Sequence, residues 1–302
     1  MTPAVNVAAP MLSLERLLHS VEDLPSLPEV AVRVARMADD PDVSADSVGR
    51  VVATDQALTA RVLRMANSAY YGVARRVSTV PEAVMILGLR TIRTLTMAAS
   101  IYPMVSRGLP GYALGRGDLW RHSIGAALCA QALARRARPT SHVIGPVVAD
   151  EAFVAGLLHD IGKMALSIHL KDHLGTTRQK ALADNVPFVV AERAVLGFDH
   201  AQAGAAMSEK WNLPASLVQA IAFHHDPLRA SHGNVGLACV THLADAMCLI
   251  LGVGVGGDGL LSTLHMEAAE ALGLADDLDE VTASCLDTLR LAGPSFDFEK
   301  AL

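Results

Sequence analysis

The chain of 302 residues is predicted to be all-α, and three observations support this. Almost every apolar segment repeats with helical period, and stretches that alternate strictly between apolar and polar residues are scarce. Residues that favour helix starts and ends, namely Pro, Ser, Asp and Gly, stand at the boundaries of these segments. With 51% hydrophobic and 19% charged residues, the composition supports one large core or two domains and argues against a mainly disordered protein.

Four predicted helices in the first part of the chain each begin at a residue that favours a helix start: Pro28, Ser44, Asp55 and Pro81. The acidic and proline residues 39–41 are expected to end the first helix, and residues 67–72 form the exit of the third. Gly88 should divide the fourth helix from another that begins after Leu89. These elements predict a helical N-terminal lobe.

The predicted seam after this lobe lies at residues 108–111 (GLPG), because glycine and proline interrupt helices. Two amphipathic segments near the C-terminus, 266–272 and 278–291, are expected to be helices that pack back onto a lobe. The predicted limits are a tail, a domain with two lobes, and a connector with C-terminal helices: residues 1–17, 18–251 (lobes 18–110 and 111–251) and 252–302.

A net charge of −6 and a sequence pI near 6.0 argue against broad adhesion to nucleic acid or to an anionic membrane. Residues 1–10 contain neither Lys nor Arg, unlike a secretory signal. The apolar stretch 235–255 is interrupted by His242, Asp245 and glycines, so we expect no transmembrane segment. Four widely spaced cysteines are expected to be reduced core residues of a cytoplasmic protein: Cys129, Cys239, Cys248 and Cys285.

The segment GLLHDIGK at residues 156–163 places an adjacent pair, His159 and Asp160, in what otherwise reads as a buried helix. Burying a polar group without a partner costs about 2 to 7 kcal/mol. The two side chains must therefore be hydrogen-bonded, ion-paired or metal-bound, and a divalent metal is the most specific of these options. A single buried histidine is more often a core residue with a hydrogen-bonded ring, so a metal site requires further ligands.

His122 and Asp245 are candidates for those ligands. Imidazole nitrogens and carboxylate oxygens together suit a divalent transition metal such as iron, manganese, nickel or zinc, and the donor types do not choose among them. Adjacent helical residues point about 100° apart, so an ion held by both His159 and Asp160 would lie beside the helix. Helices that carry His122 and Asp245 must then close over the ion, which predicts a compact bundle.

The order His, His-Asp, Asp resembles the HD superfamily of metal-dependent phosphohydrolases. In this resemblance, His200 in GFDHAQAG (197–204) and the doublet His224-His225 match positions that give some members a second metal. The predicted ligand set is therefore His122, His159, Asp160, His200, His224, His225 and Asp245. Asp199 or Asp226 is expected to accept a hydrogen bond from the second ring nitrogen of a ligating histidine.

Motifs in both lobes narrow the resemblance to the HDOD domain, an HD-related output domain of bacterial signalling proteins. They are LPSLP (24–28), ATDQALT (53–59), LRMANS (63–68), AVMILG (83–88), WRHS (120–123), WNLP (211–214) and AFHHDP (222–227). The similarity covers residues 18–251 and implies an HD-domain-like helical bundle with an N-terminal helical lobe. It also implies a regulatory or output module that acts with signalling proteins, without generally established catalysis.

The alternative is a metal-dependent phosphohydrolase or phosphodiesterase that acts on a nucleotide or cyclic dinucleotide. A bound ion lowers the pKa of water from about 15.7 towards about 7. Lys163 would neutralise phosphate charge, as its match in HD-GYP phosphodiesterases implies, although an exposed helical lysine is the commoner explanation. Residues 226–233 (DPLRASHG) lack the Gly-Tyr-Pro of that family, which favours the regulatory interpretation. Homo-oligomerisation is compatible with both.

Three further features have ordinary explanations. Residues 252–259 resemble a phosphate-binding loop in composition but follow a predicted helix, which favours a flexible connector. Nucleic acid is not an expected partner; a solvated edge or a partner-binding surface is expected for a basic and aromatic group: Arg61, Arg64, Arg75, Arg76, Tyr70 and Tyr71. Several histidines lack a matching motif and receive no metal role: His19, His142, His169, His173, His232 and His265.

Overall fold

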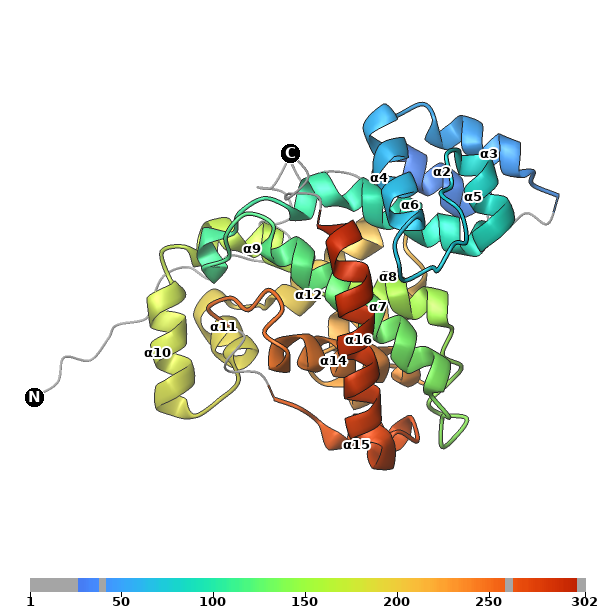
Figure 1. Cartoon of the computed structure of the whole chain (residues 1–302). Coiled ribbons are helices and arrows are strands. Elements are labelled where there is room, and N and C mark those ends of the chain that lie inside the picture. The colour runs from blue at the N-terminus through green and yellow to red at the C-terminus, as the bar shows by residue number, and fades with distance from the viewer. Residues whose placement is uncertain (1–26, 38–41, 259–262, 298–302) are drawn as a thin grey trace, which may run out of the picture.

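The computed structural model describes residues 27–37, 42–258 and 263–297. Within these ranges the chain is helical and forms no β-strand, which confirms the all-α prediction (Figure 1). The N-terminal lobe consists of α2 (Glu29–Met37), α3 (Ala45–Val52), α4 (Gln56–Ala66), α5 (Val80–Leu87) and α6 (Leu89–Val105).

The second lobe contains eight helices and two short 3-10 turns: η1 (Pro110–Tyr112), α7 (Asp118–Arg136), α8 (Ala149–Leu158), α9 (Gly162–Leu170), α10 (Leu174–Asp184), α11 (Phe188–Leu196), α12 (His200–Lys210), α13 (Ala215–Phe223), η2 (Pro227–Arg229) and α14 (Val235–Ile250). The C-terminal part adds α15 (Met266–Ala271), η4 (Ala275–Asp277) and α16 (Leu278–Phe296). Helix α16 lies along α7 (Figure 1), and Trp120 Nε1 donates a hydrogen bond to the Phe296 carbonyl at 2.7 Å.

Two of the predicted helix starts are confirmed as N-caps. Ser44 Oγ accepts from the Ser47 amide at 3.2 Å, and Asp55 Oδ1 accepts from the Leu58 amide at 2.9 Å. Helix α5 is capped by the Thr79 hydroxyl, with its proline in the first turn. The predicted helix end at residues 39–41 lies outside the described residues. The predicted tail, residues 1–17, and His19 lie outside them as well.

One continuous apolar core runs through both lobes, with α7, α8 and α14 at its centre. The rings of Tyr102 on α6 and Trp120 on α7 meet edge to face at 5.1 Å, so the lobes share this core. All four cysteines are buried and unpaired, as predicted. No helix among the described residues has the length and apolarity needed to cross a membrane.

The His159-Asp160 pair does not lie inside a continuous helix, which corrects the sequence prediction. Helix α8 ends at Leu158 and α9 begins at Gly162, so the pair lies in the turn between them. Hydrogen bonds in this turn join residues three apart, such as Ile161 N to Leu158 O at 3.0 Å. Both His159 and Asp160 are buried in this turn, which is the tighter three-residue kind that often ends or connects α-helices.

Candidate metal centre

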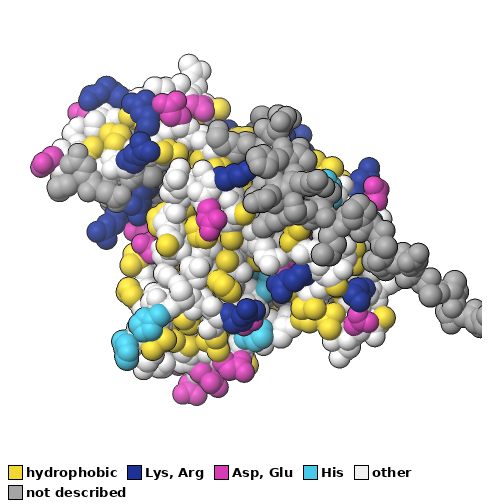
Figure 2. Space-filling view, turned by 180° about the vertical axis from the view of Figure 1, so that it is seen from behind, with side chains coloured by type: hydrophobic (Ala, Val, Ile, Leu, Met, Phe, Trp, Pro, Cys, Tyr) yellow, Lys and Arg dark blue, Asp and Glu magenta, His cyan; other side chains and the backbone are white. Residues whose placement is uncertain are grey.

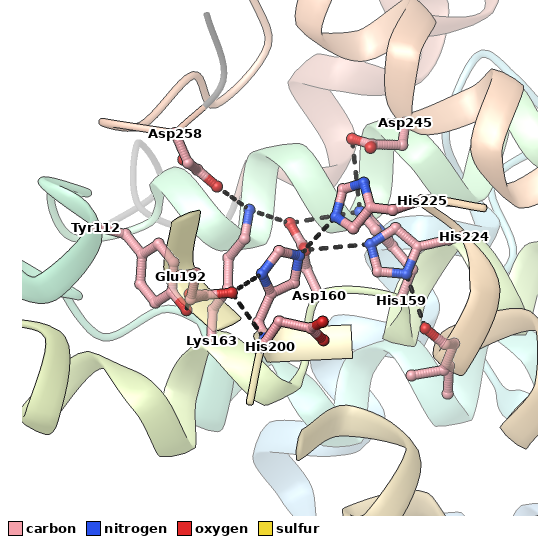
Figure 3. A network of polar contacts seen from close by, with 12 residues as sticks. Tyr112, His159, Asp160, Lys163, Glu192, His200, His224, His225, Asp245 and Asp258 are labelled. Carbon is pink, nitrogen blue, oxygen red and sulfur yellow. Dashed lines mark hydrogen bonds and ion pairs between the residues drawn. The ribbon is translucent and has the colours of Figure 1, made fainter. Parts of the chain in front are cut away.

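The structure brings all seven predicted ligand residues together around one interior centre, and Figure 3 labels all of them except His122. They come from five places: α7, the α8–α9 turn, the first residue of α12, the residues after α13, and α14. His225 is half-buried, and the other six are buried: His122, His159, Asp160, His200, His224 and Asp245. Their ligand atoms form three overlapping groups in which all atoms lie within 4.8 Å of one another.

The first part of the centre consists of two histidines and two carboxylates. His122 Nε2 lies 3.0 Å from Asp245 Oδ1 and 3.5 Å from Asp160 Oδ2. His159 Nε2 lies 3.4 Å from Asp160 Oδ2 and 3.7 Å from Asp245 Oδ1. The two Nε2 atoms are 3.2 Å apart. Ligands about 2.0–2.2 Å from a tetrahedral ion stand roughly 3 to 4 Å from each other, and this group has that spacing.

The second part consists of the three remaining histidines. His200 Nε2 lies 2.8 Å from His225 Nε2 and 3.4 Å from Asp160 Oδ1. His224 Nε2 lies 3.9 Å from the same Asp160 oxygen. The two oxygens of Asp160 therefore face the two parts of the centre, one each, which is the arrangement of a bridging carboxylate.

The outer ring nitrogens fix the tautomers of these histidines. In four of them Nδ1 faces an acceptor oxygen: His122 to Val253 O at 3.1 Å, His159 to Gly156 O at 2.8 Å, His224 to Ile221 O at 2.8 Å, and His200 to Glu192 Oε2 at 2.7 Å. A carbonyl oxygen only accepts, so Nδ1 carries the hydrogen and, in the neutral ring, Nε2 points a lone pair into the centre.

These inward lone pairs show that the residues fit a metal ion. In the neutral state, His122 and His159 direct two lone pairs at each other and at carboxylate oxygens, and nothing but a cation or a proton makes that favourable. His224 Nε2 is buried without a hydrogen-bond partner. An orphaned imidazole nitrogen, convergent lone pairs and two carboxylates together form a donor set for divalent transition metals.

The electrostatics of the protein alone give the histidines of the centre different proton affinities. Burial lowers the pKa of His159, but Asp160 and Asp245 more than reverse this and raise it to about 10. Burial lowers the pKa of His224 to about 3, with His159 and His200 adding to the effect. The centre thus holds strong proton sites beside an uncharged imidazole, and metal binding would replace the protons.

Lys163 is buried rather than exposed, which corrects the expectation of a solvated helical lysine. Its Nζ lies 2.7 Å from Asp160 Oδ2 and 2.6 Å from Asp258 Oδ2. Burial lowers its pKa, but the two carboxylates reverse this and raise the pKa above its usual value. The ammonium is therefore charged and held on two sides.

The carboxylate that orients a ligand histidine is Glu192, which the sequence analysis missed. Glu192 Oε2 accepts from the His200 amide at 2.8 Å and from its Nδ1 at 2.7 Å, and Oε1 accepts from the buried Tyr112 hydroxyl. The predicted orienting residues have other contacts: Asp199 caps α12 and pairs with Arg193, and Asp226 pairs with Arg229. The sequence signal for this role was the position of Glu192, an acidic residue on the apolar face of α11.

Gly162 allows the two halves of the centre to approach. A Cβ atom at this position would lie 2.0 Å from the His200 carbonyl oxygen and 2.5 Å from the Gly204 amide nitrogen. Such contacts are impossible without moving α9 away from α12. The glycine after the His159-Asp160 pair therefore sets the distance between Asp160 and His200.

A cleft of about 660 Å³ opens onto one side of the centre. Its walls include His200, His225, Asp245, Lys163 and Asp258, together with apolar residues of α11 and α13. His122 and His159 do not line it. The His200–His225 part of the centre is therefore the part that a ligand can approach.

The glycine-rich connector and the remaining histidines were not predicted to be ligands. The described part of the glycine-rich connector, residues 252–258, contacts the centre through His122 and Lys163. His265 donates its amide to His242 Nε2 at 2.9 Å. Four histidines are outside the ligand groups found among the described residues: His142, His169, His173 and His232.

Basic side chains gather on the N-terminal lobe (Figure 2), but the predicted basic and aromatic group does not form a stacking surface. Arg61 Nε donates to the Ala99 carbonyl at 2.9 Å, and its guanidinium lies 5.8 Å from the ring centroid of Tyr102. The Tyr70 hydroxyl contacts Gln131 at 2.8 Å, and the Tyr71 hydroxyl is buried. Tyrosines whose hydroxyls face inward in this way do not offer the open ring faces that bind bases.

Comparison with known proteins agrees with this geometry. The family model of the HDOD domain matches residues 24–227, which is more than half of the chain. The chain belongs to the HDOD family. The curated relative found is an uncharacterised protein of Treponema pallidum (strain Nichols), 27% identical over 206 residues. That match covers 68% of this chain and 38% of the relative, so the HDOD chain spans well under half of the Treponema protein.

Solved structures show the same fold. An HDOD domain protein of unknown function from Geobacter sulfurreducens has a TM-score of 0.69 and 26% identity, covering 92% of this chain and 98% of its own. A protein from Marinobacter aquaeolei VT8, named provisionally as a signal transduction protein, has a TM-score of 0.69 and 25% identity over 92% of this chain and 61% of its own. A protein from Shewanella amazonensis SB2B, named provisionally as a phosphohydrolase, has a TM-score of 0.64 and 27% identity over 93% and 96%.

Proposed function

We propose that this HDOD protein is a signal-transduction output module whose second lobe holds one or two divalent transition-metal ions and which acts through contacts with signalling proteins. The relative named for signal transduction supports the general role. The convergence of imidazole lone pairs and carboxylates supports the metal centre. We propose a cytoplasmic location because the four cysteines are widely spaced, buried and not joined in disulfides.

The observation that carries the metal proposal is the fixed tautomer of four of the five ligand histidines. His122, His159 and His224 each donate Nδ1–H to a backbone carbonyl oxygen, so their Nε2 atoms are committed to the interior. Glu192 does the same for His200. An ion held there would join α7, the α8–α9 turn, α12 and α14, and it would make the packing of the lobe depend on metal.

The setting of Lys163 favours a regulatory centre over a catalytic one. An ammonium that stabilises a phosphoryl group must have donors directed at the substrate. Here one carboxylate oxygen of Asp160 and one of Asp258 lie within 2.7 Å of Nζ, and the two side chains are 2% and 10% exposed. Lys163, the cation that contacts the centre directly, is thus already neutralised by these two carboxylates.

A metal-dependent phosphohydrolase or phosphodiesterase, acting on a nucleotide or cyclic dinucleotide, is the second candidate. The cleft beside His200 and His225 favours it, because a reaction requires an approach to the metal. Bound metal would supply an activated water and polarise a phosphoryl oxygen. In this reading the chain's own residues orient the ligands, and Arg193 and Arg229 on the cleft wall attract an anionic substrate.

One experiment separates these proposals: elemental analysis of purified protein together with a turnover panel of nucleotides and phosphodiesters. The variants are His159→Ala and Asp160→Ala, and the control is His232→Ala, an exposed histidine outside the ligand groups. We expect near-stoichiometric metal in the wild type and in the control, metal loss in both site variants, and no turnover. Metal-dependent turnover at enzyme-like rates would replace the regulatory proposal with the enzymatic one, and a metal-free wild type would refute the centre.

A further inference from the structure

The connector after α14 returns to the metal centre. The Val253 carbonyl oxygen lies 3.1 Å from His122 Nδ1, and the Gly257 amide donates to the Tyr112 carbonyl oxygen at 2.6 Å. Asp258 Oδ2 then reaches Lys163 Nζ at 2.6 Å, and Figure 3 shows it approaching from a separate part of the chain. We call residues 252–258 the strap.

The path of the strap depends on glycine. A Cβ atom on Gly254 would lie 2.6 Å from the Asp118 carbonyl oxygen and 2.7 Å from His122 Cβ, and its φ of 62° also disfavours other residues. The strap therefore passes directly over the start of α7, against a ligand histidine. A loose linker would not need such a close approach.

The strap is nevertheless held by little apolar surface. Its only apolar side chains are Val253 and Val255, and Val255 is 37% exposed. The principal side-chain anchor is the Asp258–Lys163 ion pair, whose partners are 10% and 9% exposed. A segment with few buried contacts and several glycines opens more readily than the helices around it.

Electrostatics decides what can open the strap. If Asp258 left alone, the buried ammonium of Lys163 would keep only Asp160 as an ion-pair partner, and the oxygens of Asp160 also face the metal ligands. A buried charge that loses its partner is strongly penalised. Asp258 therefore leaves readily only when another anion takes its place at Lys163. The cleft that both residues line gives such an anion a route.

We propose that Asp258 is a tethered internal occupant of an anion site at Lys163, and that a small oxyanion such as the phosphate group of a ligand enters the cleft by displacing it. The exchange replaces one negatively charged oxygen with another on the same ammonium donor. Displacement frees the strap between α14 and α15 and alters the surface beside the cleft. This gate rests on the proposed function, because it treats the cleft as the ligand side of the centre.

The test is calorimetric titration of inorganic phosphate into purified protein whose metal content has been measured. Asp258→Asn keeps the size of the side chain and removes the competing charge, so phosphate should bind about tenfold more tightly than to wild type. Asp184→Asn makes the same charge change on α10, outside the cleft lining, where Asp184 faces Lys180 at 2.7 Å. This control should change the affinity by less than about threefold. Lys163→Met should abolish phosphate binding both in the wild type and in the Asp258→Asn variant.

Hydrogen exchange on the wild type provides a second readout that needs no variant. Saturating phosphate should speed exchange at the Gly257 amide, because the strap leaves the Tyr112 carbonyl. Unchanged or slower exchange at saturation would overturn the gate, and so would equal gains in affinity for Asp258→Asn and Asp184→Asn. Metal content measured on the same samples keeps the two proposals apart. Tighter phosphate binding by a metal-free Asp258→Asn protein would support the gate and contradict the metal centre, whereas unchanged binding by a metal-loaded one would contradict the gate alone.

Discussion

His122 and His159 hold their Nε2 atoms 3.2 Å apart although the Nδ1 atom of each ring faces a backbone carbonyl oxygen. Each carbonyl commits its ring to the same tautomer, so two neutral rings would meet lone pair to lone pair. Either a proton or a metal ion must lie between them and the nearby carboxylates. The two possibilities differ in how the protein responds to a chelator.

We expect removal of metal to lower the thermal stability of the wild-type protein. A ligand present at a hundredfold excess over its dissociation constant stabilises the native state by about 2.7 kcal/mol, which corresponds to several degrees in melting temperature. Thermal unfolding before and after chelation, and after metal is returned, measures this. His159→Ala should show no response to the chelator. An unchanged melting temperature of the wild type would indicate that protons, not metal, occupy the centre.

Glu192→Gln should weaken metal binding without unfolding the protein. The amide oxygen of glutamine replaces only part of the acceptor set, because Glu192 accepts from Tyr112 and twice from His200. Loss of a carboxylate behind a ligand histidine typically costs about 10 to 100-fold in metal affinity. Competition titration against a metal indicator measures the change. Glu209→Gln, which removes an exposed charge from the same α12 helix as His200, should retain the wild-type affinity; equal affinities for both variants would show that Glu192 has no such role.

Gly162→Ala should destabilise the protein because the new Cβ would overlap the His200 carbonyl oxygen at 2.0 Å. Separating α9 from α12 is expected to cost about 3 kcal/mol or more. Gly175→Ala in α10 is the matched control, since no atom lies within 4 Å of its added Cβ. That change should be neutral or stabilise by up to about 1 kcal/mol. Urea unfolding of both variants tests the packing, and similar stabilities would contradict it.

The sequence predicted the fold well where local signals decide it. Caps such as Ser44 and Asp55 act on the nearest turn, so their effect is visible in a few residues. The His159-Asp160 turn escaped prediction because its cause is distant: the backbone of α12 packs against Gly162. An apolar run of that kind reads as one helix unless the neighbouring element is known.

The candidate ligand residues could be predicted from the sequence, whereas the residues that contact and orient them could not. Polar residues such as His159 and Asp245 stand out in apolar segments, and each requires a partner. Glu192 stands in a helix beside Arg193, where charged residues are common, so its place on the apolar face of α11 is a weak signal. Asp258 lies in a glycine-rich segment that has no periodicity to define a face. Its contact with Lys163 follows from the path of the strap, which no local pattern encodes.

Acid should destabilise the metal-free protein partly through His242, which supports the histidine doublet from α14. His242 Nδ1 donates to the His224 carbonyl oxygen at 2.7 Å, and its Nε2 accepts from the His265 amide. Burial lowers the pKa of His242, and His265 adds to this, while the hydrogen bond to His224 opposes it. The unfolded chain therefore takes up a proton near pH 6.5, whereas the folded protein takes it up only at lower pH.

The sign follows from these proton affinities. Below about pH 6.5 the unfolded state binds one more proton than the native state, so stability is full above that pH and falls as the pH drops. One such proton contributes a slope of up to about 1.4 kcal/mol per pH unit. Urea unfolding in chelator between pH 7 and pH 5 should show a shallower loss for His242→Asn, which keeps a donor near the His224 carbonyl but cannot titrate. His232→Asn, an exposed control, should keep the wild-type slope. Equal slopes for His242→Asn and the wild type would mean that His242 does not take up a proton at a lower pH in the folded protein than in the unfolded chain.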